Sequence, residues 1–157
     1  MSRRNMEIVK IWRNTFIELF LETYSFFIPP KHLKSYVSFP ILLAFLLGGT
    51  GYFFHPLNKT SVSKLIWIAF MEELTWRVLI QEQLNTLLHN KKLYSVSVSC
   101  IVTSVFFALF HLFRQPAAMA ALVFFPAMIF GMLWDKYKNP YVCIGMHFWY
   151  NFTFFYF

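Results

Sequence analysis

Two adjacent glutamates interrupt an otherwise largely apolar stretch of the sequence. Glu72 and Glu73, followed by Arg77, lie near the middle of a segment that runs from Ser61 to about Leu88. A charged side chain at the centre of a bilayer costs about 2.5 to 3.5 kcal/mol even on the lenient insertion scale. Two acids at membrane depth therefore indicate a functional site.

Helical geometry predicts different roles for the two glutamates. At 3.6 residues per turn, Glu73 and Arg77 lie on one face with the acid first, which is the better order for an ion pair. Glu72 lies about 100° away and shares its stripe with Trp76. We therefore predict that Glu73 and Arg77 pair as supporting residues, whereas Glu72 takes its partner from another helix. A carboxylate that has no ion-pair partner in its own helix is suited to general base catalysis.

Three further polar residues in apolar segments are candidate partners for Glu72. His111 lies near the end of one apolar segment, and His147 and Asn151 lie at an i,i+4 spacing in the last one, so that they face the same way. Glu72 is about 12 Å of helix from Lys64, between the centre and one end of its segment. The four polar side chains are expected to converge on one water-containing cavity inside the bundle.

The composition excludes both a soluble domain and a nucleic-acid-binding one. Of the 157 residues, 58% are hydrophobic, 22% are aromatic and 13% are charged, whereas soluble domains have roughly 25% charged residues. The net charge of +7 is assigned to loops beside the bilayer, and no nucleic-acid partner is expected. Cys100 and Cys143 both fall in apolar runs, which indicates neither a disulfide framework nor a cysteine metal motif.

The apolar runs predict an all-α fold, a polytopic transmembrane helical bundle. Residues 1–35 are expected to form an N-terminal amphipathic segment, with a helix over 7–28 that is interfacial or spanning. Residues 36–157 are expected to form the transmembrane catalytic bundle. Its spanning helices should number about five, from the length rule of about 20 apolar residues each, over residues 36–54, 61–88, 94–113, 117–134 and 140–157.

The loop charges predict the orientation of the bundle. If residues 7–28 do not cross the membrane, ten of the Lys and Arg residues fall on the side of the N-terminus and three fall on the other side. The positive-inside rule then places the N-terminus in the cytoplasm. The site is expected in the outer half of the membrane.

The motifs that carry these residues are typical of a known family. Glu-Glu-x-x-x-Arg at residues 72–77, Phe-x-x-x-His at 107–111 and His-x-x-x-Asn at 147–151 follow one another on successive apolar segments. In this order they resemble the CPBP (CAAX protease and bacteriocin-processing, or Abi) family of intramembrane glutamic proteases. The resemblance covers a family core at 61–157, and Gly131 also resembles the family pattern.

The resemblance implies a role for each candidate residue. Glu72 with His111 would activate the attacking water, and His147 with Asn151 would hold the scissile carbonyl and its oxyanion. Glu73 and Arg77 would be supporting residues. The expected substrate is a membrane-anchored protein or peptide, cleaved in or next to its membrane segment, as in the C-terminal anchor or sorting-signal processing of short bacterial members. The expected location is a bacterial cytoplasmic membrane.

Three other interpretations stay open at this point. A zinc site could use Glu72 with the two histidines, but no H-E-x-x-H pairing occurs, so we expect no metal or other cofactor. A non-catalytic membrane protein, such as a bacteriocin-immunity factor, could capture a peptide in the same cavity. An ion or proton carrier would need a polar path across both halves of the membrane, and we identify none in the cytoplasmic half.

Overall fold

The part of the chain that the structure describes is mostly helical. The computed structural model describes residues 38–54 and 60–156, and the predicted segment 1–35 lies outside them. The helices are α2 (Phe39–Gly49), the 3-10 helix η2 (Thr50–Phe54), α3 (Val62–Glu73), the π-helix η3 (Leu74–Gln81), α4 (Glu82–Leu87), α5 (Val98–His111), α6 (Ala117–Tyr137) and α7 (Pro140–Phe155). Two short strands, β1 (Lys92–Leu93) and β2 (Val96–Ser97), pair in antiparallel orientation. The predicted all-α class is confirmed.

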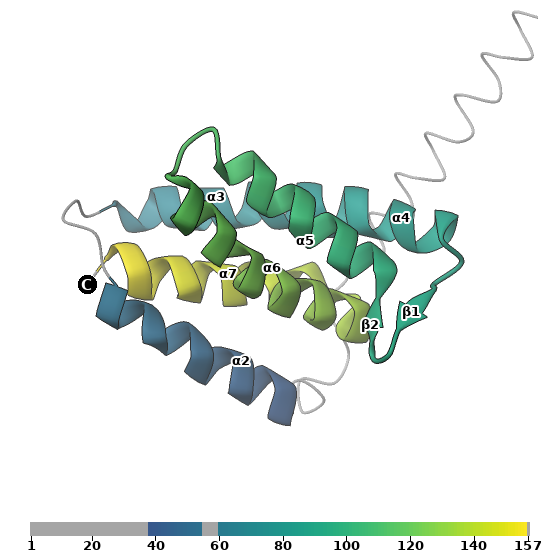
Figure 1. Ribbon diagram of the computed structural model, residues 1–157. Helices are drawn as coiled ribbons and strands as arrows, with labels where there is room; N and C mark the ends of the chain where they lie inside the picture. Colours follow the sequence, from purple (N-terminus) through teal and green to yellow (C-terminus); the bar gives the residue numbers. More distant parts are fainter. Residues whose placement is uncertain (1–37, 55–59, 157) are drawn as a thin grey trace, which may run out of the picture. The chain divides into compact units, whose positions relative to one another are not determined.

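Helices α3, η3 and α4 form one continuous rod, and the successive rods of residues 38–156 run alternately in opposite directions (Figure 1). The strands, the start of α2 and the connection from α6 to α7 lie at one end, which we call the hairpin end. The start of α3, the turn from α5 to α6 and the end of α7 lie at the opposite end. Helix α5 packs along α6, and α3 packs along α7.

Capping residues set the starts of the two helices that follow the hairpin end. Asn139 accepts hydrogen bonds from the backbone N–H groups of Tyr141, at 2.9 Å, and Val142, at 3.4 Å, with Pro140 in the first turn of α7. The Ser97 hydroxyl accepts a bond of 2.9 Å from the Cys100 N–H at the start of α5. These caps satisfy amide groups that have no partner within the helix.

The predicted start of the third apolar segment at residue 94 is wrong. Helix α5 begins at Val98, and residues 92–97 form a hairpin around a tight turn. Tyr94 has a left-handed backbone conformation, with a φ of 55°, and it is 96% exposed. Apolar composition could not separate this hairpin from the helix that follows it, because β-branched and aromatic residues suit both.

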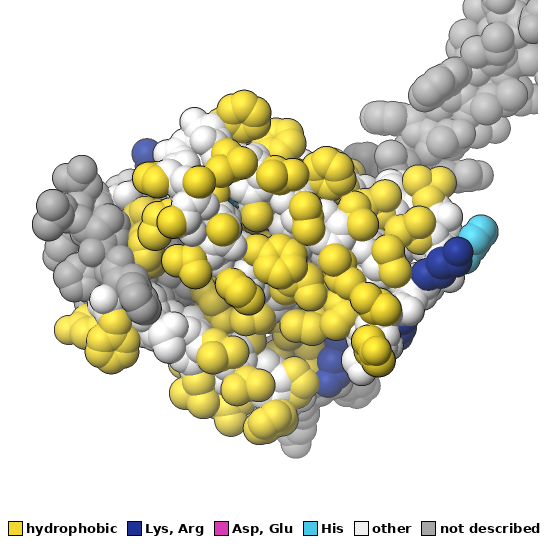
Figure 2. All heavy atoms as spheres, viewed as in Figure 1, with side chains coloured by type: hydrophobic (Ala, Val, Ile, Leu, Met, Phe, Trp, Pro, Cys, Tyr) yellow, Lys and Arg dark blue, Asp and Glu magenta, His cyan; other side chains and the backbone are white. Residues whose placement is uncertain are grey.

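The outer surface of the bundle is apolar. Helix α6 is long and apolar enough to cross a membrane, and the shorter apolar helices cover Phe39–Phe53 and Val98–His111. Figure 2 shows hydrophobic side chains over most of one face, with Lys and Arg side chains toward its ends. A surface of this kind suits lipid. The predicted number of spanning helices stays a prediction. Exposed large side chains include Phe39, Leu46, Phe53, Trp67, Phe113, Leu122 and Phe125.

Candidate active site

The helix that carries the two glutamates changes its winding directly after them. Residues Leu74–Gln81 form a π-helix, which has more residues per turn than an α-helix and is frequent at functional sites. A step of four residues overshoots one turn of an α-helix and falls short of one turn of a π-helix. Alternating the two windings therefore keeps every fourth residue on one side. The side chains at this spacing, Glu73, Arg77, Gln81 and Asn85, are all at most 3% exposed.

Glu73 and Arg77 form the predicted ion pair. Arg77 Nε donates to Glu73 Oε2 at 3.1 Å, and both side chains are fully buried. The guanidinium carbon lies 5.8 Å from the centre of the Phe107 ring, within reach of a cation–π interaction. The expectation that Glu73 is neutralised within its own helix is confirmed.

His147 lies between the two glutamates. Its Nδ1 is 2.8 Å from Glu73 Oε1, and its Nε2 is 3.7 Å from Glu72 Oε2. Since a carboxylate only accepts, Nδ1 carries the proton and donates it to Glu73. The ring also stacks on Phe130, with 5.0 Å between centroids. The sequence predicted a partner for Glu72 among His111, His147 and Asn151, and the structure brings His147 to it.

The two glutamates differ sharply in exposure. The Glu72 side chain is 27% exposed, whereas that of Glu73 is fully buried. The 3.7 Å separation between Glu72 and His147 exceeds the length of a hydrogen bond. Glu72 is therefore the carboxylate that can meet a reactant, and Glu73 is the one that holds its neighbours.

His111 contacts the site through an aromatic ring. Its Nδ1 donates to the Phe107 carbonyl oxygen at 2.8 Å, one turn earlier in α5. This bond leaves Nε2 with the lone pair of the neutral ring. Phe107 lies between the two imidazoles, with ring centroids 4.6 Å from His111 and 6.2 Å from His147. No ion pair joins His111 to Glu72 in the described part of the chain.

Asn151 lies one turn after His147 on α7, as the spacing predicted. Its side chain is half-buried, and it forms no hydrogen bond to any residue in the described ranges. The amide therefore remains available as a donor. Trp76, which was expected on the stripe of Glu72, packs edge-on against Phe107, with 5.5 Å between the ring centroids.

Sequence reasoning missed a buried polar chain that extends from Arg77 to the hairpin end. Arg77 Nη1 donates to Gln81 Oε1 at 3.0 Å, and Gln81 Nε2 donates to Asp135 Oδ1 at 3.0 Å. Asn85 Nδ2 donates to the same Asp135 oxygen at 3.1 Å, and the Ser97 hydroxyl donates to the other oxygen. The sequence signal was the spacing of four residues from Glu73 through Asn85, which defines one face only with the π-helical winding of Leu74–Gln81.

The expectation that the half predicted to be cytoplasmic, which contains the hairpin, has no polar path is wrong, because these buried polar side chains lie in it. The members of the buried polar chain nevertheless suit a rigid support better than a proton carrier. The Arg77 guanidinium has donors alone, and the side chains of Gln81 and Asn85 are amides, which are not acids or bases in water. The buried polar chain can hold the Arg77 side chain in place, but its members do not form a continuous series of titratable groups.

Gly131 is required by the close approach of α5 and α6. A Cβ atom at this position would lie 2.5 Å from Cys100 Sγ and 3.0 Å from Gln81 Oε1. We expect Gly131→Ala to lower the free energy of unfolding by about 1 to 3 kcal/mol, measured by chemical unfolding in mild detergent. Gly145→Ala is the matched control, because nothing lies within 4 Å of a Cβ there. Equal unfolding midpoints for the two variants would contradict this packing.

Metal-binding groups are not clustered in the described ranges. Within residues 38–54 and 60–156, no three His, Cys, Asp or Glu side chains are placed to hold one metal ion. His147 Nδ1 is engaged by Glu73, and His111 Nδ1 is engaged by a backbone carbonyl. Cys100 and Cys143 are buried and free. The absence of a cofactor stays a prediction.

The described helices form a bundle with an apolar outer surface and an internal polar site, in which Glu73, Arg77 and His147 are buried. Residues 38–153 match the family model for Type II CAAX prenyl endopeptidase Rce1-like. The chain therefore belongs to this family, and its predicted place in the CPBP family is confirmed. Comparisons with curated proteins and with solved structures gave no match. Membership indicates a peptidase, and proteins of this family are integral membrane proteins.

Proposed function

We propose that the chain is an intramembrane endopeptidase of the glutamic type. Glu72 acts as the general base, and the other site residues orient the substrate and stabilise charge. The observation that carries this proposal is the position of His147, held by the buried Glu73 at Nδ1 and facing the accessible Glu72 at Nε2. This arrangement places a carboxylate that can act as a base beside an imidazole that can donate to developing negative charge.

The reaction assigns one step to each group. Glu72 takes a proton from water as the water oxygen bonds to the scissile carbonyl carbon, and the carbonyl oxygen becomes an oxyanion. His147 Nε2–H and the Asn151 amide donate to that oxyanion. Glu72 then gives the proton to the amine nitrogen as the C–N bond breaks. His111 Nε2 accepts from the water and orients it.

The assignment sets a requirement on the charges of the site. The proposed role of His147 requires a ring that carries a proton on both nitrogens, so that His147 and Arg77 balance the two carboxylates Glu72 and Glu73. A site without net charge avoids much of the cost of placing single charges in an apolar bundle. The protonated ring is also the form that donates from Nε2 while Nδ1 donates to Glu73.

The charge distribution supports an orientation with the hairpin end in the cytoplasm. Lys91, Lys92, Lys136 and Lys138 belong to the hairpin end, whereas Lys64 and Arg114 belong to the opposite end. The positive-inside rule then directs the hairpin end inward. We propose a bacterial cytoplasmic membrane, a site open to the outer half, and substrates whose C-terminal anchor or sorting signal is cleaved next to the membrane.

Cleavage by the purified protein tests the proposal. The full chain in mild detergent is incubated with a tagged protein that ends in a membrane anchor, and separately with a prenylated C-terminal peptide, and products are identified by mass spectrometry. We expect the anchored protein to be cleaved beside its apolar segment. Binding without products from either substrate would favour the non-catalytic peptide-binding protein. Cleavage of the prenylated peptide alone would overturn the proposed substrate.

The same assay tests the zinc alternative. We expect the cleavage rate to be unchanged after incubation with a strong zinc chelator, because Glu72 rather than a metal activates the water. The measurement compares initial rates with and without the chelator, and again after excess zinc is added. Loss of activity that zinc restores would show that the metal-free mechanism is wrong.

A further inference from the structure

Gln81 is the central residue of the buried polar chain. Its side chain is fully buried, and it makes three hydrogen bonds of 3.0 Å each. Its oxygen accepts from Arg77 Nη1, and its nitrogen donates to the Gly131 carbonyl and to Asp135 Oδ1. The side chain therefore links the helix of the candidate site to α6.

The partners of Gln81 permit only one orientation of its amide. A guanidinium has donors alone, so it must meet the amide oxygen, while a carbonyl and a carboxylate have acceptors alone, so they must meet the amide nitrogen. A reversed amide would place its nitrogen against the Arg77 donor and its oxygen against the two acceptors, the Gly131 carbonyl and Asp135. Asp135 thus helps to decide which side of Gln81 faces Arg77.

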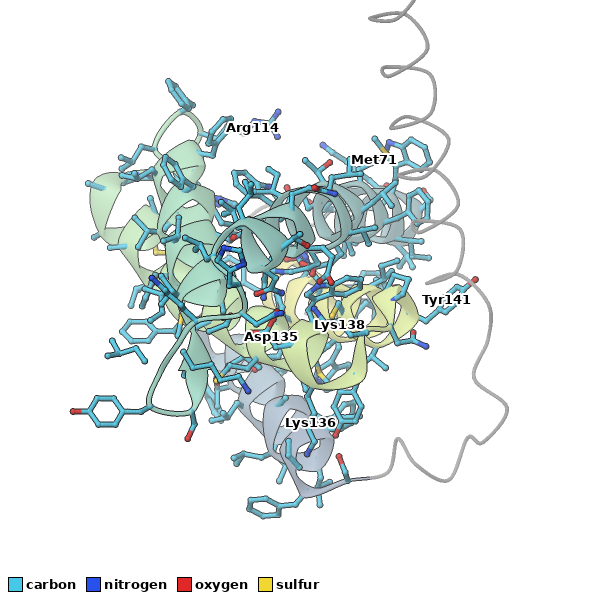
Figure 3. The ribbon with its side chains drawn as sticks, turned by 90° about the vertical axis from the view of Figure 1, so that its right-hand side faces the viewer. Met71, Arg114, Asp135, Lys136, Lys138 and Tyr141 are labelled. Atoms are coloured by element: carbon cyan, nitrogen blue, oxygen red, sulfur yellow. The ribbon has the colours of Figure 1, made fainter. Side chains whose placement is uncertain are left out.

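Asp135 is itself held from several sides. Its two carboxylate oxygens accept from Gln81, from Asn85 on α4 and from Ser97, the residue that caps α5. Figure 3 views the hairpin end and shows Asp135 among the helices, whereas Lys136 points outward. The carboxylate is therefore a fixed point shared by α4, α5 and α6.

Two further contacts connect Arg77, the partner of Gln81, to His147. Arg77 bonds one oxygen of Glu73, and His147 bonds the other oxygen. Glu73 therefore cannot rotate without breaking one of these two bonds. A shift of Arg77 would turn Glu73 and move His147 Nε2 relative to Glu72.

We propose that Gln81 and Asp135 are positioning residues that set the orientation of His147 through Arg77 and Glu73. This inference rests on the proposed function, in which His147 stabilises the oxyanion. Neither residue lies in the motifs that carry the family resemblance. The buried polar chain acts on His147 through its Nδ1 atom, whereas Glu72 faces the Nε2 atom.

Gln81→Glu tests the proposal with almost no change of shape. The new carboxylate keeps an acceptor toward Arg77, and it places its second oxygen against the Gly131 carbonyl and Asp135. We expect kcat to fall roughly 10- to 100-fold while KM changes little, because the substrate contacts remain. Gln83→Glu, the same substitution at an exposed position two residues away, is expected to leave both constants unchanged.

Asp135→Asn provides the rescue. In the double variant Gln81→Glu/Asp135→Asn, the new amide can donate to the new carboxylate, so that kcat should recover part of the loss. Recovery is partial because the new carboxylate still faces the Gly131 carbonyl and Asn85 loses its acceptor oxygen. A non-specific structural defect would not be restored by a second change in the core. Thermal unfolding in detergent is recorded for all variants, so that a loss of folded protein is separated from a loss of rate.

A spectroscopic measurement tests positioning independently of cleavage. In protein labelled with 15N-histidine, His147 is assigned by its absence in His147→Gln. We expect its Nδ1 and Nε2 signals to shift in Gln81→Glu and to move back toward the wild-type positions in the double variant. Unchanged signals in folded Gln81→Glu, or a loss of kcat that Asp135→Asn does not restore, would overturn the inference. If the wild-type chain cleaves nothing, the proposed function fails, and these signals still decide the positioning.

Discussion

Glu72→Gln is expected to abolish peptide hydrolysis while leaving the bundle folded. The substitution keeps the shape of the side chain, but the amide cannot take a proton from water. General base catalysis contributes about 10²- to 10⁴-fold to a rate, and we expect kcat to fall by that amount. Because Glu72 is partly exposed and makes no hydrogen bond to residues in the described ranges, the loss of stability should be small.

The assay for Glu72→Gln needs a control on the same helix. Thr75→Ala changes an exposed residue of η3 and is expected to cleave at the rate of the wild-type protein. Substrate capture by Glu72→Gln, measured by co-purification with the anchored protein, should persist, because the contacts that hold a peptide are unchanged. If Glu72→Gln cleaves as fast as the wild-type chain, Glu72 is not the base.

The helices were predictable because each depends on a local pattern. Pro140 and the apolar run after it define the start of α7 without reference to other segments. The hairpin at residues 92–97 was missed because its strands have only two residues each. Such short strands are stabilised by a tight turn and by the caps around them, which an apolar window does not register.

The site was predictable within one helix and much less so between helices. The Glu73–Arg77 pair follows from a spacing of four residues. The bond from His147 to Glu73 depends on how α7 is rotated against α3, and a single sequence does not define that rotation. The family resemblance directed attention to the pairing of Glu72 with His111, whereas the structure places His147 between both glutamates.

The polar chain toward the hairpin was missed for a different reason. Gln81 and Asn85 carry no charge, so they did not stand out beside Glu72 and Glu73 in an apolar segment. Their burial arises from the π-helical winding of residues 74–81, which changes the face that each residue occupies. A regular helix of 3.6 residues per turn does not predict that change.

Arg77→Met is expected to have the largest effect on stability. Both members of the Glu73–Arg77 pair are fully buried, so the substitution leaves a carboxylate inside the bundle without its permanent positive partner. Breaking a buried pair from one side costs about 3 to 5 kcal/mol. Gln81 also loses the donor to its oxygen. The free energy of unfolding, measured by denaturant titration in mild detergent, should fall by at least this amount.

A double variant separates the uncompensated charge from the loss of packing. In Glu73→Gln/Arg77→Met both charges are removed, and the new amide oxygen can still accept from His147 Nδ1. Replacing both members of a buried pair is often neutral, so the double variant should be more stable than Arg77→Met alone. If Arg77→Met unfolds at the wild-type midpoint, or if the double variant is as unstable as the single one, the pair does not stabilise the bundle through its charge. Recovered stability without recovered cleavage would instead indicate that Arg77 is needed twice, to neutralise Glu73 and to keep His147 in its orientation.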